Sequence, residues 1–118
     1  MKSYDTRIIG TWTVTDVDRF GLGGSITALP FTNGKFTFHK NGTLIYVNSS
    51  NLTFNGNWEI VKKAINDQTV RSLHITAIDF TNQQVLAEYY NDMQFTGTDR
   101  FRANIIKGLH TYVTHFRR

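Results

Sequence analysis

The sequence contains no cysteine, and only one of its 118 residues is proline. The absence of cysteine excludes disulfide bonds, thiolate nucleophiles and cysteine-based zinc sites. The scarcity of proline leaves β-strands uninterrupted, because proline removes a ladder hydrogen bond. A run of about 18 apolar residues is also missing, and residues 1–7 are polar, which predicts neither a membrane span nor an intact signal peptide.

The net charge of the chain is small. Thirteen Lys and Arg against nine Asp and Glu give a net charge of +4. The basic residues are scattered, with adjacent pairs only at Lys62/Lys63 and Arg117/Arg118. A nucleic-acid binder is expected to gather them on one face with exposed aromatic residues between them. The sequence therefore predicts a solvated, mildly basic surface and no nucleic-acid partner.

Apolar and aromatic residues are plentiful. They make up 40% and 14% of the chain, respectively, which favours a folded globule over a disordered chain. The length is that of one domain with a core large enough to need no metal or disulfide. We expect a single domain over residues 1–118.

Short segments rich in Thr, Val, Ile, Phe and Tyr recur between Gly, Asn and Asp, as in successive strands joined by tight turns. The eight predicted strands are 8–17, 35–40, 43–48, 54–61, 70–80, 84–90, 93–102 and 109–117. Asn41-Gly42 predicts a hairpin with a type I′ turn, and the strands 84–90 and 93–102 are expected to pair as a hairpin across Asn91-Asp92. The segment 99–108 has an alternative as a helix, capped by Asp99 and ended by Gly108.

Eight sequential hairpin strands leave exposed edges unless the first strand pairs with the last. The predicted fold class is therefore all-β, an eight-stranded antiparallel up-and-down barrel, with a two-sheet sandwich as the alternative. The connection 20–34 between strands one and two is long and apolar for an exposed loop. We expect it to act as a lid or plug at the barrel mouth.

Several motifs resemble those of one known family. Gly10-Thr11-Trp12, at the start of the first predicted strand, resembles the G-x-W motif of the lipocalins, and more specifically the short lipocalin-like domain proteins of Bacteroidetes. The segments 36–38, 41–43, 56–60 and 116–118 are similar to later strands of that group. The resemblance implies a calycin-type, lipocalin-like barrel. It also implies export to the bacterial cell envelope, although no leader or lipidated cysteine is present.

The resemblance also implies a set of residues at the barrel base. In lipocalins a basic residue near the end of the barrel packs over the tryptophan at the closed base. Gly10, Trp12 and Arg117 are the corresponding residues, with Arg118 as the alternative to Arg117. An eight-strand meander is consistent with this, because its first strand starts and its last strand ends at the same rim.

Alternation along the strands predicts which side chains point into the barrel. These inward residues are Trp12, Val14, Phe36, Phe38, Leu44, Tyr46, Phe54, Trp58, Ile60, Leu73, Ile75 and Ala77. An eight-stranded barrel is just wide enough to be filled by its own side chains or to hold one small ligand. For the second case the candidate ligand-binding residues are Phe36, Phe38, Tyr46, Trp58, Tyr112 and His110.

Motifs for catalysis are missing. The four histidines are His39, His74, His110 and His115, and no two have the spacing of a zinc motif with a carboxylate nearby. No P-loop, G-x-S-x-G or dinucleotide motif occurs. We therefore expect no enzyme, metal site or cofactor.

Two functions follow from these features. The first is a non-enzymatic lipocalin-like domain that binds a small apolar or amphipathic ligand between aromatic walls. The alternative is a structural or interaction domain of the cell envelope, which has a filled barrel and contacts a protein or glycan with its outer face. A cavity would favour the first function, and a packed interior would favour the second.

Overall fold

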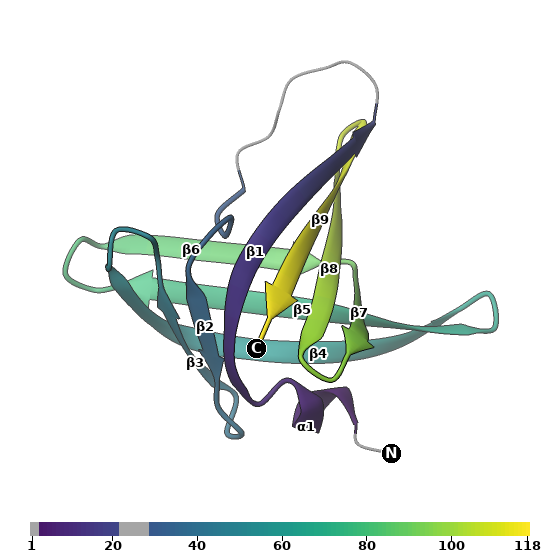
Figure 1. Cartoon of the computed structure of the whole chain (residues 1–118), viewed down its shortest axis with the longest axis horizontal. Helices are drawn as coiled ribbons and strands as arrows, with labels where there is room; N and C mark the ends of the chain where they lie inside the picture. The colour runs from purple at the N-terminus through teal and green to yellow at the C-terminus, as the bar shows by residue number, and fades with distance from the viewer. Residues whose placement is uncertain (1–2, 22–28) are drawn as a thin grey trace.

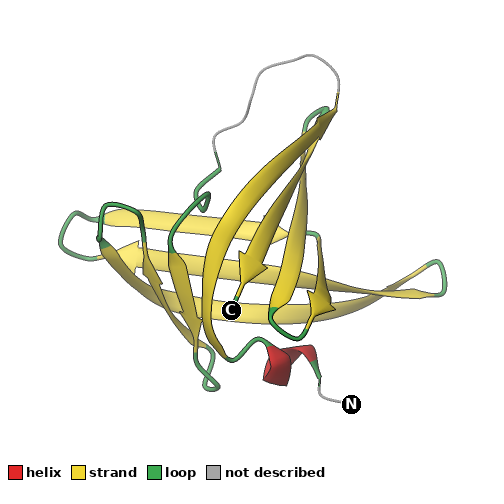
Figure 2. Cartoon of the chain, in the orientation of Figure 1, coloured by secondary structure: helices red, strands yellow, loops and turns green. Residues whose placement is uncertain are grey.

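The structure is a computed structural model that describes residues 3–21 and 29–118 (Figures 1 and 2). One short helix precedes nine strands. The elements are α1 (Tyr4–Arg7), β1 (Gly10–Gly21), β2 (Lys35–Phe38), β3 (Thr43–Val47), β4 (Thr53–Ile65), β5 (Gln68–Asp79), β6 (Gln84–Tyr90), β7 (Asp92–Gly97), β8 (Arg100–Lys107) and β9 (His110–Arg117). The predicted all-β antiparallel class is confirmed. Within the described residues, no helix has the length and apolar character needed to cross a membrane.

All nine strands form one antiparallel sheet in the order β6-β5-β4-β3-β2-β1-β9-β8-β7. The first strand pairs with the last, as the prediction requires, but β6 and β7 are both edge strands. The predicted closure into an eight-stranded barrel is therefore not confirmed. The sheet instead folds over, so that the steep strands β1, β9 and β8 cross the nearly horizontal β4, β5 and β6 (Figure 1).

The sheet stays open between β6 and β7 because the chain turns there too tightly for a hairpin. Only Asn91 separates the two strands, whereas the commonest tight hairpin needs about two loop residues. Asn91 instead joins β5 and β8. Its carbonyl oxygen accepts a hydrogen bond from Ser72 Oγ at 2.9 Å, and its Oδ1 accepts one from the Ile106 backbone N–H at 3.2 Å. The hairpin predicted at Asn91-Asp92 is therefore wrong.

The predicted seventh strand, 93–102, is two strands. The chain reverses after Gly97, and β8 then runs back along β7. The helix considered for 99–108 does not form, because the burial of this segment has a period of two. Phe101, Ala103 and Ile105 are buried, and the residues between them are partly exposed. The extra reversal accounts for nine strands instead of eight.

The hairpin predicted at Asn41-Gly42 joins β2 to β3, but its turn differs from the prediction. Gly42 has a positive φ of 88°, and Asn41 does not share the positive φ that a type I′ turn requires. Asn41 contributes through its side chain, whose Oδ1 accepts hydrogen bonds from the backbone N–H and hydroxyl of Thr43 at 3.0 and 2.7 Å.

The predicted inward residues form one core. Of the twelve, ten are buried, and Trp58 and Ile60 pack against them while partly buried. Strand alternation alone predicted these positions, because successive side chains point to opposite faces. The short helix α1 was not predicted. It begins after Ser3, whose hydroxyl accepts a hydrogen bond from the Thr6 N–H, and it leads to the buried Ile8.

Candidate functional site

The predicted ligand-binding residues of β2 and β3 fill the interior with one another. Phe36 stacks on Tyr46 at 4.5 Å and on Phe38 at 5.9 Å between ring centroids. Trp58 of β4 and Phe38 form a T-shaped pair with ring centroids 5.8 Å apart, and the Trp58 indole N–H donates to the His39 carbonyl at 2.9 Å. These contacts hold the rings against each other, so this part of the interior is a packed aromatic core.

The long connection after β1 reinforces this packing. Its segment 22–28 lies outside the described residues, but Phe31 is fully buried, 5.2 Å from Phe36 and 5.0 Å from Tyr46. The Tyr46 hydroxyl donates to the Asn33 carbonyl at 2.8 Å, and burial raises the pKa of Tyr46. The described part of the connection therefore seals this side of the core.

The other two predicted ligand-binding residues, His110 and Tyr112, are buried on the inner face of β9. They lie beside the place where the sheet is not closed. There Lys107 of β8 forms an ion pair at 3.3 Å with Glu88 of β6, whose side chain is only 4% exposed. Glu88 Oε1 also accepts a hydrogen bond from the Tyr89 N–H, while Oε2 is buried with no hydrogen-bond partner among the described residues. Burial and the Glu88 charge both raise the pKa of the nearby Tyr90.

Gly10 and Trp12 lie at the start of β1, and the basic residue over Trp12 is Arg118. Its guanidinium lies 4.4 Å from the centre of the indole ring, which is itself fully buried. Arg118 also donates to the carbonyls of Ile9 and Thr98 at 3.0 and 2.8 Å. Arg117 belongs to the opposite face, because its neighbour Phe116 points inward. The assignment of Arg117 is therefore corrected to Arg118.

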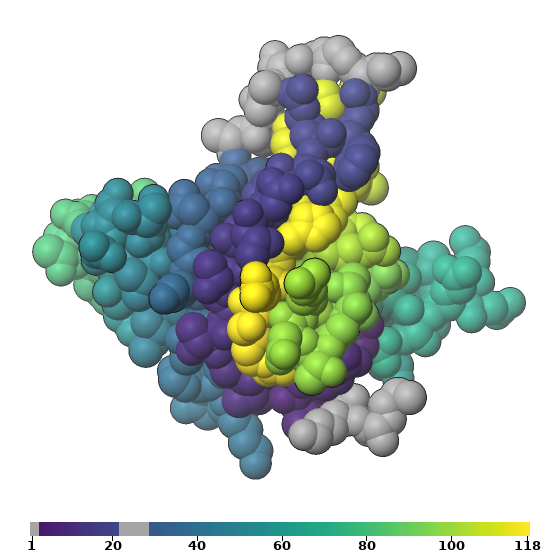
Figure 3. All heavy atoms as spheres, in the orientation of Figure 1, coloured from purple at the N-terminus to yellow at the C-terminus, as the bar shows by residue number. Residues whose placement is uncertain are grey.

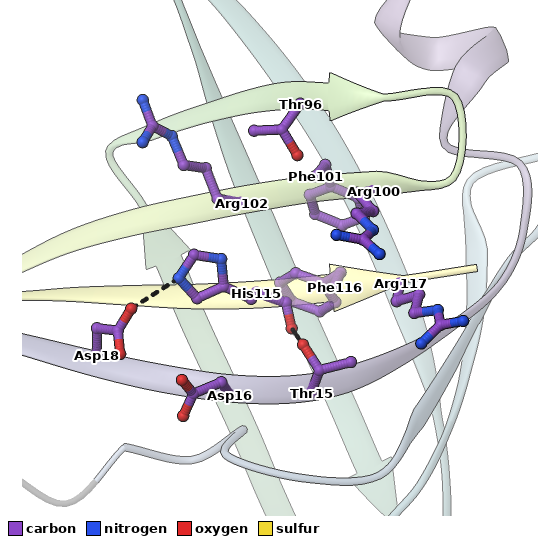
Figure 4. A pocket seen from close by; sticks show the side chains of 10 residues that line it. All are labelled: Thr15, Asp16, Asp18, Thr96, Arg100, Phe101, Arg102, His115, Phe116 and Arg117. Atoms are coloured by element: carbon purple, nitrogen blue, oxygen red, sulfur yellow. Dashed lines mark hydrogen bonds and ion pairs between the residues drawn. The ribbon is translucent and has the colours of Figure 1, made fainter.

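A charged hollow of about 540 Å³ lies on the outer face of β1, β9 and β8 (Figure 4). Its polar lining consists of Thr15, Asp16, Asp18, Thr96, Arg100, Arg102, His115 and Arg117. His115 Nε2 and Asp18 Oδ2 lie 2.9 Å apart. Arg100 and Arg117 lie at the other end of the hollow from Asp18 (Figure 4).

Two side chains of β7, Gln94 and Asp92, hold Arg102 in place. It donates to Gln94 Oε1 at 2.8 Å, and Gln94 in turn donates to Asp92 at 3.4 Å. Burial raises the pKa of Asp92, and the charge of Arg102 acts in the opposite direction. The hollow therefore presents arginines and hydroxyl groups to solvent, together with the carboxylates of Asp16 and Asp18. Its arginine end suits the binding of an anionic group. Among the described residues, no three His, Asp or Glu side chains are placed to hold a metal ion.

This hollow was not predicted from the sequence. Its residues come from 15–18, 96–102 and 115–117, so the cluster exists only through the pairing of β1 with β9 and of β9 with β8. The alternation of side chains along a strand was the available signal. Arg117 and Arg100 each adjoin a buried phenylalanine and therefore point to the outer face. Comparisons with family models, curated proteins and solved structures found no match for this chain.

Proposed function

We propose that this protein is a non-enzymatic interaction domain whose interior serves stability and whose outer face binds a protein or glycan partner. The observation that supports it is the contact of Phe31, Phe36 and Tyr46 with one another, where an apolar ligand was expected. The hollow on the outer face gives such a partner a charged surface. The lipocalin-like resemblance adds the cell envelope as the place where the partner is met.

We also propose kinship with the lipocalin-like group. Three features support it: the Gly10-Thr11-Trp12 motif begins β1, β1 pairs with β9, and Arg118 lies over Trp12. The open edge between β6 and β7 departs from a closed lipocalin barrel. The kinship therefore concerns the base and the strand order, and it does not require a roomy ligand cavity.

The test is a titration with lauric acid and with the neutral dye N-phenyl-1-naphthylamine. We expect no saturable 1:1 binding, because the aromatic rings occupy the interior. The readout is the tryptophan emission of the wild-type protein. Trp58→Phe serves as a control, because it leaves Trp12 as the reporter. Saturable binding of either compound, with quenching that disappears in Trp58→Phe, would overturn the proposal.

Binding of a small amphipathic ligand remains a second candidate function. The observation that favours it is Glu88, whose Oε1 pairs with Lys107 while its buried Oε2 has no hydrogen-bond partner in the part of the chain that the structure describes. A buried carboxylate oxygen without a partner is costly, and a ligand amine would satisfy it. Under this function dodecylamine binds with 1:1 stoichiometry, lauric acid does not, and Glu88→Gln abolishes the binding of the amine. Absence of dodecylamine binding to the wild-type protein would exclude it.

A further inference from the structure

The sheet register places basic residues that are far apart in the sequence in one row. Lys35 of β2 pairs with Thr13 of β1, Thr13 with Arg117 of β9, and Arg117 with Arg100 of β8. All four side chains are exposed, and they point outward, because the adjoining aromatic residues are buried. We call the three cations Lys35, Arg117 and Arg100 the basic row. The face formed by β1, β9 and β8 is turned toward the viewer in Figure 3.

None of the three cations of the basic row forms an ion pair within the described protein, although the carboxylates of Asp16 and Asp18 line the same hollow as Arg100 and Arg117. The ion pairs there are Lys107–Glu88, His115–Asp18 and Arg118–Asp99, and none of them includes a residue of the basic row. Arg100 and Arg117 are directly opposite each other on adjacent strands, an arrangement in which like charges are destabilising. An anion that bridges the two guanidinium groups removes this repulsion.

The shape of the basic row fits an extended partner. Adjacent strands lie about 4.8 Å apart, so the row crosses three intervals and spans about 14 Å. A linear polymer laid across the strands meets positive charge at intervals of one and two strands. Arg102, in the neighbouring outward row beside His115, adds a further cation in the hollow.

We propose that this outer face binds a linear acidic glycan, with the basic row contacting its carboxylate or sulfate groups. This inference rests on the proposed function and names the ligand class of its outer face. Arginine forms forked hydrogen bonds with such groups, and the hydroxyls of Thr13 and Thr96 are available beside the cations for sugar hydroxyls.

A glycan fits better than a single-stranded nucleic acid. Proteins that bind single strands without sequence preference stack the bases on exposed aromatic side chains. On these strands the aromatic residues beside the basic row are Trp12, Phe36, Phe101 and Phe116, and all four are buried on the inner face. The outer face near the basic row therefore offers charge and hydroxyl groups without a stacking surface.

The test compares the wild-type protein with Arg100→Gln/Arg117→Gln. A matched control, Lys40→Gln/Lys62→Gln, removes the same charge from exposed lysines outside the basic row. The probes are heparin octasaccharide for sulfate, an oligogalacturonate for carboxylate, a neutral dextran, and a dT oligonucleotide. Calorimetry gives the affinity, and amide chemical shifts locate the site.

We expect one of the two acidic glycans to bind, with shifts confined to β2, β1, β9 and β8. The arginine double variant should weaken binding by about tenfold or more, and the lysine control by much less. Equal weakening in both variants, shifts elsewhere, or preference for the dT oligonucleotide would each overturn the inference. A protein that binds neither glycan and also excludes the apolar probes overturns this inference while leaving a packed interaction domain in place.

Discussion

The inner and outer faces of β8 and β9 differ at neighbouring residues. Phe116 and Phe101 are buried and stack on each other at 4.3 Å between ring centroids. Their chain neighbours Arg117 and Arg100 are exposed and lie opposite each other. Because strand side chains alternate between faces, one short segment serves both packing and recognition. Substitution of neighbouring residues should therefore change different measurable properties.

Replacement of Phe116 by Ala should give the largest effect. Phe116 is 1% exposed and contacts Phe101 and Phe36, so its truncation leaves a cavity among aromatic rings. We expect a loss of about 3–5 kcal/mol in the free energy of unfolding, measured by urea denaturation. The neighbouring variant Arg117→Ala should change this free energy by about 0.5 kcal/mol or less. Equal losses in the two variants would contradict the division between faces.

Lys107 tests the ion pair on the inner face. Lys107→Met leaves the Glu88 carboxylate, 4% exposed, without its cation. We expect a loss of about 2 kcal/mol, below the 3–5 kcal/mol of fully buried pairs because Lys107 is 36% exposed. Urea denaturation gives the value, and amide exchange in β6 and β8 should accelerate.

The control for Lys107 is the double variant Glu88→Gln/Lys107→Met. It removes both charges, so it should lose less stability than Lys107→Met alone. If the double variant is instead the less stable of the two, the ion pair does not join β6 to β8 in the way its geometry indicates.

Arg118 provides a second comparison with Arg117, because the Arg118 side chain packs over Trp12 at the edge of the core. Arg118→Ala removes the contact with Trp12 and the hydrogen bonds to Ile9 and Thr98. We expect a loss of about 1–2 kcal/mol in the free energy of unfolding and a shift in tryptophan emission. Arg118→Lys keeps the charge without the forked donors, so its free energy of unfolding should lie between those of the wild-type protein and Arg118→Ala. An Arg118→Ala protein as stable as Arg117→Ala would show that the cap contributes nothing.

Much of the local structure followed from the sequence. Alternation predicted the inward positions, and Asn41-Gly42 predicted the hairpin between β2 and β3, because both signals act between residues close in the chain. The sequence predicted eight strands, whereas the described residues form nine. The reversal after Gly97 has only a single glycine as its signal, within a segment that otherwise has the composition of one strand.

The candidate site was decided by tertiary structure. The sequence showed scattered basic residues, and only the pairing of β2, β1, β9 and β8 brought Lys35, Arg117 and Arg100 into one row. The open edge between β6 and β7 likewise depends on Asn91 binding β5 and β8. By itself the sequence predicted most of the strands and which residues face inward, because strand periodicity is local. Tertiary structure decided which outward residues become neighbours, because register joins positions far apart in the chain.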